Sequence, residues 1–140
     1  MYLDEVKEII ILDRDTCMPE KSARYKVRTK LWLHDEEGNV IFGMGRTKML
    51  EAIERCGSIS AAAKELKMSY RAVWARIKAT EERLGGQPLL ICSKGGVSGG
   101  GATLTPFAKD LIKQYRALRK GVLSQSDKLY KKLCGPLIEK

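Results

Sequence analysis

The sequence of 140 residues predicts a mainly α-helical α+β fold, and three features support this prediction. A short helix and a longer one, separated by about three residues, are expected between Gly57 and Leu84. A strand, a glycine-dense loop and a return strand are expected between Pro88 and Leu104, followed by a long helix from Thr105. A β-hairpin is expected before the first helix of the chain. This order of elements is typical of a winged helix-turn-helix with an N-terminal β-hairpin and a long C-terminal dimerisation helix.

The N-terminal hairpin is predicted within residues 25–42. Apolar and polar side chains alternate from Tyr25 to His34, and a period of two is typical of a strand with one buried face. The sequence DEEGN at 35–39 is expected to form the turn, and the apolar residues 40–42 begin the return strand.

Two helices are predicted directly after this hairpin. The first carries an apolar stripe that reaches Ile53, and Gly57 is expected to end it because glycine readily adopts a left-handed backbone conformation. The second covers residues 61–66. Ser58 and Ser60 are its candidate N-caps, because a serine oxygen accepts a hydrogen bond from an unpaired N–H group of the first turn.

A third helix is predicted from Tyr70 to about Leu84, after a short break at residues 67–69. A helix-turn-helix needs small residues where its helices cross, and Ala63, with Ala62 beside it, meets this requirement. From the helical spacing we expect the buried side of the third helix to consist of Val73, Trp74, Ile77 and Leu84.

The C-terminal helix is expected to begin with Thr105 as its cap and Pro106 at its first position, where proline is well tolerated. A break is expected near residues 124–126, and Gly135-Pro136 is expected to end the helix. Its predicted apolar stripe consists of Phe107, Leu111, Tyr115, Leu118 and Val122. The predicted organisation is therefore an N-terminal extension (1–24), a winged helix-turn-helix with its preceding hairpin (25–104) and a C-terminal helical dimerisation segment (105–140).

The charge distribution favours a polyanionic partner. The formal net charge is +9, and the basic residues concentrate in the middle and the C-terminal third of the chain. Residues 1–20 instead contain six acidic and two basic side chains. We expect a cytoplasmic protein without membrane contact, because the sequence contains neither a long apolar run nor a signal-peptide pattern.

Neither an enzyme, a cofactor nor a metal site is predicted. The four cysteines are far apart in the sequence and lack the paired spacing of zinc ligands, so we expect free thiols. His34 is the only histidine, which leaves no set of nucleophile and base. The glycine-dense loop does not match a P-loop, because Gly101 is followed by Ala102-Thr103 rather than by lysine and a hydroxyl residue.

The candidate DNA-binding residues lie on the open side of the third helix, at the helix caps and in the loop. Side chains at the start of such a helix suit phosphates and major-groove base edges, and glycine lets the backbone approach phosphates closely. The predicted set is Ser58, Ser60, Ser69, Tyr70, Arg71, Ala75, Arg76, Lys78, Lys94, Gly99 and Gly100.

The sequence also allows two other interpretations of the region between Gly57 and Leu104. The same helices could form an ordinary helical hairpin with an alanine-rich seam and a charged outer face. A winged helix could also bind protein rather than DNA. The basic, hydroxyl-rich start at Ser69-Tyr70-Arg71 favours DNA, because a protein-binding version would not need it.

Residues 46–118 resemble the N-terminal DNA-binding domain of ModE-type, molybdate-responsive regulators and, more distantly, the winged helix of LysR-type regulators. The resemblance is carried by SISAAAKELKMSYRAVWARI, by the GGGATLT that ends the loop, and by KLWLHDEEGNVIFG in the hairpin. It implies a homodimer on a pseudopalindromic double-stranded DNA operator, with Tyr70, Arg71 and Arg76 nearest the bases. We expect no molybdate-binding domain in this chain, so another ligand or a separate sensor protein is the expected source of any signal.

Overall fold

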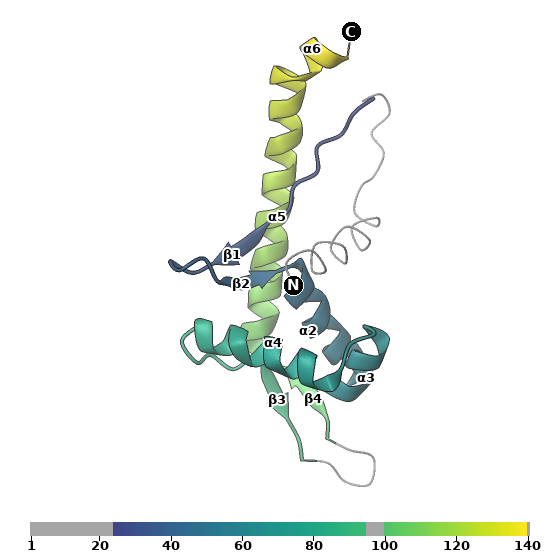
Figure 1. Cartoon of the computed structure of the whole chain (residues 1–140), viewed down its shortest axis with the longest axis vertical. Helices are drawn as coiled ribbons and strands as arrows, with labels where there is room; N and C mark the ends of the chain where they lie inside the picture. The colour runs from purple at the N-terminus through teal and green to yellow at the C-terminus, as the bar shows by residue number, and fades with distance from the viewer. Residues whose placement is uncertain (1–23, 95–99, 140) are drawn as a thin grey trace. The chain divides into compact units, whose positions relative to one another are not determined.

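The computed structural model describes residues 24–94 and 100–139 (Figure 1). The N-terminal extension, apart from Arg24, and Gly99 lie outside the described residues. The chain divides into two compact units, Trp32–Lys113 and a second unit that combines 24–31 with 114–139 of the described residues. The elements are β1 (Trp32–His34), β2 (Val40–Gly43), α2 (Met44–Cys56), α3 (Ile59–Glu65), α4 (Tyr70–Arg83), β3 (Leu90–Cys92), β4 (Ala102–Leu104), α5 (Pro106–Leu133) and α6 (Gly135–Ile138).

The hairpin β1–β2 is antiparallel, as predicted, with Leu33 opposite Phe42. The carboxylate of Asp35 accepts hydrogen bonds from the backbone N–H groups of Glu37 and Asn39, both at 2.9 Å, and so closes the turn. The hydrogen bonds from Asn39 also lower the pKa of Asp35. The predicted first strand, residues 25–34, was too long, and β1 begins only at Trp32. The reason is that β2 has only four residues, so it offers backbone partners only to residues 32–34.

The core of the larger unit lies among α2, α4 and the strands. Its largest fully buried side chains are Phe42, Leu50, Ile53, Val73, Ile77 and Leu89. Helix α2 ends at Gly57, as predicted, with φ of 77° and its N–H donating to the carbonyl of Ile53 at 2.8 Å. The left-handed conformation at this position is the reason that glycine suits the end of the helix.

The helix-turn-helix consists of α3 and α4. Ser58 and Ser69 cap these helices, with their hydroxyls accepting from the N–H groups of Ala61 and Ala72 at 3.1 and 3.0 Å. Ala62 and Ala63 are buried, as the close helix crossing requires. These observations confirm the predicted helix-turn-helix motif.

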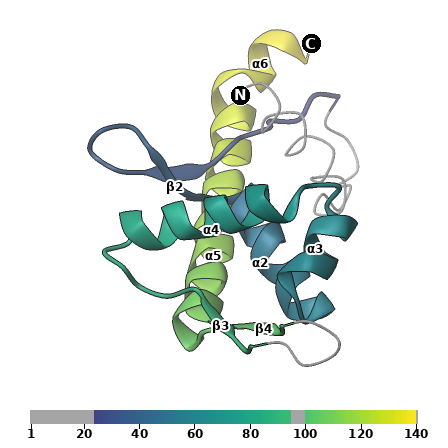
Figure 2. The same ribbon diagram turned by 60° about the horizontal axis from the view of Figure 1, so that its bottom comes forward.

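The hairpin β3–β4 completes a winged helix-turn-helix and extends beside α3 and α4 in Figures 1 and 2. The N–H of Ala102 donates to the carbonyl of Gly57 at 2.8 Å, and the N–H of Leu104 donates to Glu54 at 2.7 Å. The backbone of β4 is therefore joined to the end of α2. The hydrogen bond from Leu104 and the ion pair with Lys109 lower the pKa of Glu54.

Helix α5 begins as predicted, since the Thr105 hydroxyl accepts from the N–H of Ala108 at 3.1 Å. The predicted break near residues 124–126 is wrong, because α5 continues to Leu133. The Ser126 hydroxyl donates to the carbonyl of Val122 at 2.8 Å, so this serine satisfies its hydrogen bonding within the helix. After the end of α5, Gly135-Pro136 opens the short helix α6.

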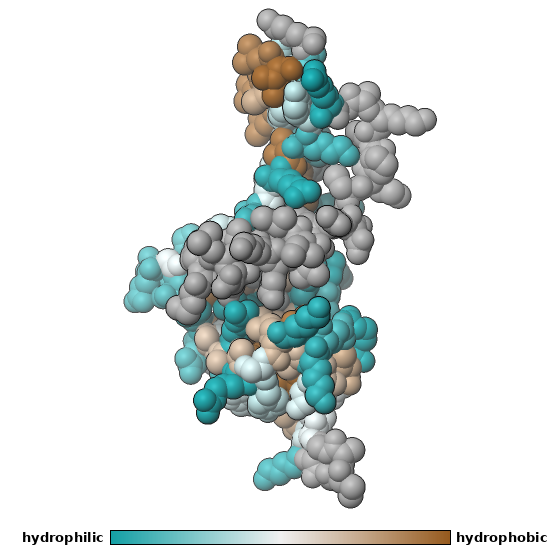
Figure 3. Space-filling model, turned by 45° about the vertical axis from the view of Figure 1, so that its right-hand side comes forward, coloured by the Kyte–Doolittle hydropathy of each residue, from teal (hydrophilic) through white to brown (hydrophobic). Residues whose placement is uncertain are grey.

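The predicted apolar stripe of α5 is only partly buried. Of that stripe Tyr115 alone is buried, whereas Phe107 and Leu118 are exposed. The other buried residues of α5 are Ala108 and Ile112, which the prediction did not include. In the smaller unit, the Tyr115 hydroxyl donates to the carbonyl of Leu31 at 2.7 Å. Apolar side chains gather at the C-terminal end of the chain in Figure 3, where the exposed hydrophobic residues are Leu129, Leu133, Leu137 and Ile138.

Candidate nucleic-acid interface

The solvent-facing side of α4 begins with Tyr70 and Arg71 and continues through Trp74 and Ala75, all of which are exposed. The prediction that Trp74 is buried is wrong, because 36% of it is exposed. Successive residues on an α-helix are about 100° apart, and the buried residue next to it is Val73. Val73 and Ile77 face the core and are fully buried, so Trp74 lies at the boundary between the buried and the exposed side of α4.

The rings of Tyr70 and Trp74 form a stacked pair on this side. Their centroids are 6.5 Å apart and their planes differ by 11°. The ammonium group of Lys78 lies over the Trp74 ring, 4.5 Å from its centroid. Attraction between the cation and the negative face of the indole ring favours this position.

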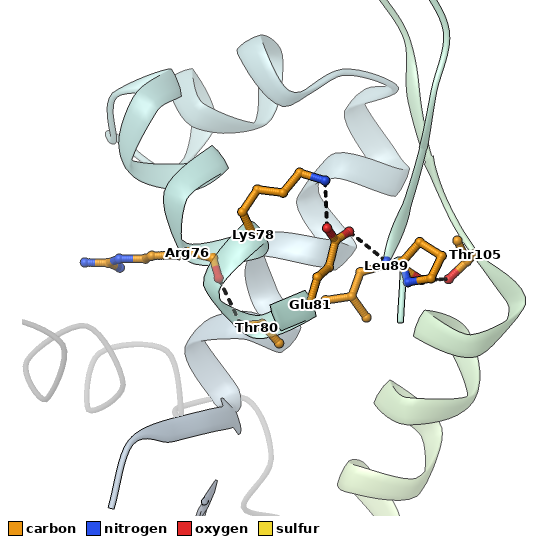
Figure 4. Close-up of polar contacts among 7 residues, drawn as sticks. Arg76, Lys78, Thr80, Glu81, Leu89 and Thr105 are labelled. Atoms are coloured by element: carbon orange, nitrogen blue, oxygen red, sulfur yellow. Dashed lines mark hydrogen bonds and ion pairs between the residues drawn. The ribbon is translucent and has the colours of Figure 1, made fainter. Parts of the chain in front are cut away.

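Lys78 is also tied to the base of the wing through Glu81 (Figure 4). The Lys78 ammonium is 2.7 Å from one carboxylate oxygen of Glu81, and the other oxygen accepts from the backbone N–H of Leu89 at 2.9 Å. The carbonyl of Leu89 in turn accepts from the N–H of Thr105 at 3.1 Å. Glu81 therefore connects α4 to the start of β3. The pair of Lys78 and Glu81 has the i,i+3 spacing at which side chains meet on one side of a helix.

We expect Glu81→Ala to lower the free energy of unfolding by about 1–3 kcal/mol, because it leaves the buried N–H of Leu89 without its acceptor. Urea unfolding followed by circular dichroism measures this change. The matched control is Glu82→Ala, which removes an exposed carboxylate of the same helix and should change stability by less than about 0.5 kcal/mol. Equal effects of both substitutions would contradict this role of Glu81.

Arg76 lies on a different side of α4 from the aromatic pair. It is half-buried, and in Figure 4 its side chain points away from Lys78 and Glu81. The Thr80 hydroxyl donates to the Arg76 carbonyl at 2.9 Å and accepts from Arg46 at 3.4 Å. Arg71 and Arg76 are about 140° apart around the helix, so the structure does not bring these two predicted residues together.

The predicted residues at the start of the helices fall into two groups. Ser58 and Ser69 use their hydroxyls as caps, as described above. Ser60, Tyr70 and Gly100 instead line one shallow hollow between the helix pair and the wing hairpin, together with Ile59, Cys92, Ser93, Gly101 and Ala102. Lys94 is exposed at the end of β3, next to the part of the wing that contains Gly99 and lies outside the described residues.

Of the three cysteines among the described residues, Cys56 is half-buried, whereas Cys92 and Cys134 are exposed. The Cys56 thiol donates to Glu65 at 2.9 Å, and Glu65 also pairs with Arg55. The hydrogen bond to Glu65 and partial burial raise the pKa of the Cys56 thiol, which makes it a weaker nucleophile. Among residues 24–94 and 100–139, no cluster of three metal-ligating side chains occurs, and no helix is long and apolar enough to cross a membrane.

Comparison with known proteins identifies the helix-turn-helix region. Residues 44–109 match the family model described as bacterial regulatory helix-turn-helix protein, lysR family. The chain is 45% identical over 80 residues to the molybdenum-pterin-binding protein MopB of Rhodobacter capsulatus, which covers 57% of this chain and 29% of MopB. It is 42% identical over 88 residues to the molybdenum transport protein ModE of Azotobacter vinelandii, which covers 63% of this chain and 32% of that protein.

Among solved structures, the chain is similar to a CbnR_DBD–DNA complex, with a TM-score of 0.47 and 22% identity over 65% of this chain and 98% of that one. The chain spans about a third of the length of the curated relatives given above. The segment matched by the family model, residues 44–109, contains the helix-turn-helix and both strands of the β3–β4 hairpin. The chain is therefore similar in sequence to the ModE-type proteins MopB and ModE, and its residues 44–109 match the helix-turn-helix model of the lysR family.

Proposed function

We propose that this chain is a sequence-specific, double-stranded-DNA-binding transcriptional regulator. The observation that carries the proposal is the exposed side of α4 in a ModE-type domain, where Tyr70 and Arg71 directly follow the Ser69 cap. In helix-turn-helix proteins the N-terminal residues of the second helix contact base edges in the major groove. We assign that role to α4 and assign backbone contacts to Lys94 and the glycine-rich wing, including Gly99 and Gly100.

The remaining predicted residues receive roles that follow from their environment. Ser60 lies in the hollow beside Tyr70, and we assign to it a contact with the phosphate backbone. Ser58 and Ser69 cap the N-termini of α3 and α4, and we assign to them the orientation of these helix ends toward the phosphates. Ala75 leaves space for a base edge on the exposed side of α4. Lys78 is directed at Trp74 and Glu81, which makes it a positioning residue rather than a phosphate ligand.

The proposed assembly is a homodimer on a pseudopalindromic operator. Helix α5 carries exposed leucines, and we propose that a second copy of the chain buries them in the dimer. These residues are Leu118, Leu129 and Leu133. A two-fold dimer places its two α4 helices one DNA turn, roughly 34 Å, or a multiple of it apart. The proposed role is non-catalytic and assigns neither cofactor nor metal.

Fluorescence anisotropy with random duplex DNA and a genomic fragment library tests the proposal. We expect tight binding at about 50 mM salt that weakens roughly 100-fold at about 200 mM, because neutralising about four phosphates releases their counterions. The bound fragments should enrich a pseudopalindrome. Absence of binding at low salt by the folded chain would overturn the proposal and favour a winged helix that binds protein.

A further inference from the structure

The exposed side of α4 carries an aromatic pair, Tyr70 and Trp74, and attraction of basic residues to phosphate gives no reason for exposed aromatic rings at this position. We propose that Trp74 is a specificity-determining residue whose exposed ring contacts the C5-methyl group of thymine in the major groove. This inference rests on the proposed DNA-binding function and deepens it. In this proposal Trp74 recognises one base through apolar contact, in addition to the bases that the basic residues of α4 recognise through hydrogen bonds.

The first argument is that Trp74 is not needed to fill the core. Val73 and Ile77, its neighbours on the buried side, are both fully buried, whereas Trp74 is 36% and Tyr70 is 51% exposed. Single exposed hydrophobic residues are common on protein surfaces. Two stacked rings one helical turn apart, beside Arg71, form a larger apolar surface at the end of the helix that is expected to enter the groove.

The second argument is that the ring is held in place before any ligand binds. Tyr70 stacks on Trp74, and the ammonium of Lys78 lies 4.5 Å from the ring centroid. Lys78 is itself fixed by Glu81, which is anchored by the backbone of Leu89. A side chain that is already ordered loses little conformational entropy on binding, so contacts made by this ring contribute more fully to affinity.

The third argument is the chemistry of the groove. Of the base edges in the major groove, thymine alone presents a methyl group, and the other groups there are hydrogen-bond donors and acceptors. The carbon edge of an indole offers apolar contact but little hydrogen bonding. Burial of one methyl group corresponds to about a fourfold change in affinity. Arg71, three residues earlier on the exposed side, is placed to donate hydrogen bonds to a neighbouring base.

Replacement of thymine by deoxyuridine tests the inference, because deoxyuridine lacks only the methyl group. A duplex selected by the wild-type chain from a random library is synthesised with deoxyuridine at each thymine in turn, and affinities are measured by anisotropy at fixed salt. We expect one thymine in each half-site at which the change weakens wild-type binding about fourfold. Trp74→Ala should bind the thymine and deoxyuridine duplexes equally, and Trp74→Phe should retain part of the difference.

Trp32→Ala is the matched control, since Trp32 is a comparably exposed tryptophan (37%) on β1 and should leave the thymine preference unchanged. Circular dichroism verifies that each variant is folded. Equal thymine preference in Trp74→Ala and wild type, or no preference in wild type, would overturn the inference and leave the proposed function intact. A uniform loss for all sequences in Trp74→Ala would also overturn it. Failure of the folded wild type to bind any duplex would overturn both proposals.

Discussion

Replacement of Ile77 by alanine is expected to lower the free energy of unfolding by about 2–5 kcal/mol. Ile77 is fully buried on the inner side of α4, the helix that packs against α2, α3 and β2. Truncation removes apolar burial and leaves a cavity that the surrounding side chains fill only in part. Domains of this size are commonly stable by only about 5–15 kcal/mol, so the expected loss is a large fraction of the total.

Ile91→Ala is the matched control for this prediction. Ile91 is the same residue type, but it is 57% exposed on β3, so its truncation should cost less than about 1 kcal/mol. Urea unfolding of both variants and of the wild type gives the comparison directly. A loss below about 1 kcal/mol for Ile77→Ala would mean that α4 is not held by the core described here.

The parts of the fold that the sequence predicted are those governed by local interactions. Ser58, Ser69 and Thr105 each cap a helix within three residues of their own position, so the pattern is complete in a short segment. Gly57 similarly ends α2 through its own backbone conformation. These local signals were sufficient to predict the order of helices and wing strands.

The parts that the sequence did not predict depend on distant partners or on the exact edge of the core. The role of Glu81 as a hydrogen-bond acceptor could not be predicted, because it depends on the N–H of Leu89, which lies beyond the turn at Gly85-Gly86. Trp74 fits the helical period of a buried side, yet only the packed structure determines where the core ends. The long α5 shows the reverse case, where Ser126 looked like a break but bonds within the helix.

The same distinction explains which candidate site residues could be predicted. Position along α4 identifies Tyr70 and Arg71 as the start of the exposed side, and the structure places them there. The helical rotation also predicts that Arg76 lies on a different side of α4 from Arg71. That Arg76 is half-buried could not be predicted in this way. The contact between Lys78 and the Trp74 ring could not be predicted, because a lysine in the middle of a helix has the same sequence pattern with or without such a contact.

Replacement of Arg71 by alanine is expected to weaken binding to the selected operator by about 1–3 kcal/mol, or roughly 5- to 150-fold, and to relax specificity at one base position. Arg71 is exposed on α4 directly after Tyr70, where a guanidinium group can donate two hydrogen bonds to guanine. Anisotropy titrations with the operator and with single-base variants measure both effects.

Lys94→Ala provides the contrast that separates base reading from phosphate binding. Lys94 is exposed at the end of β3, so its loss should weaken binding to all sequences to a similar extent and reduce the salt slope by about 1. If Arg71→Ala instead behaves like Lys94→Ala, Arg71 contacts the backbone and base reading falls to the rest of α4. Unchanged affinity and specificity in the Arg71 variant would remove the start of α4 from the interface, because no other cation directly follows the Ser69 cap.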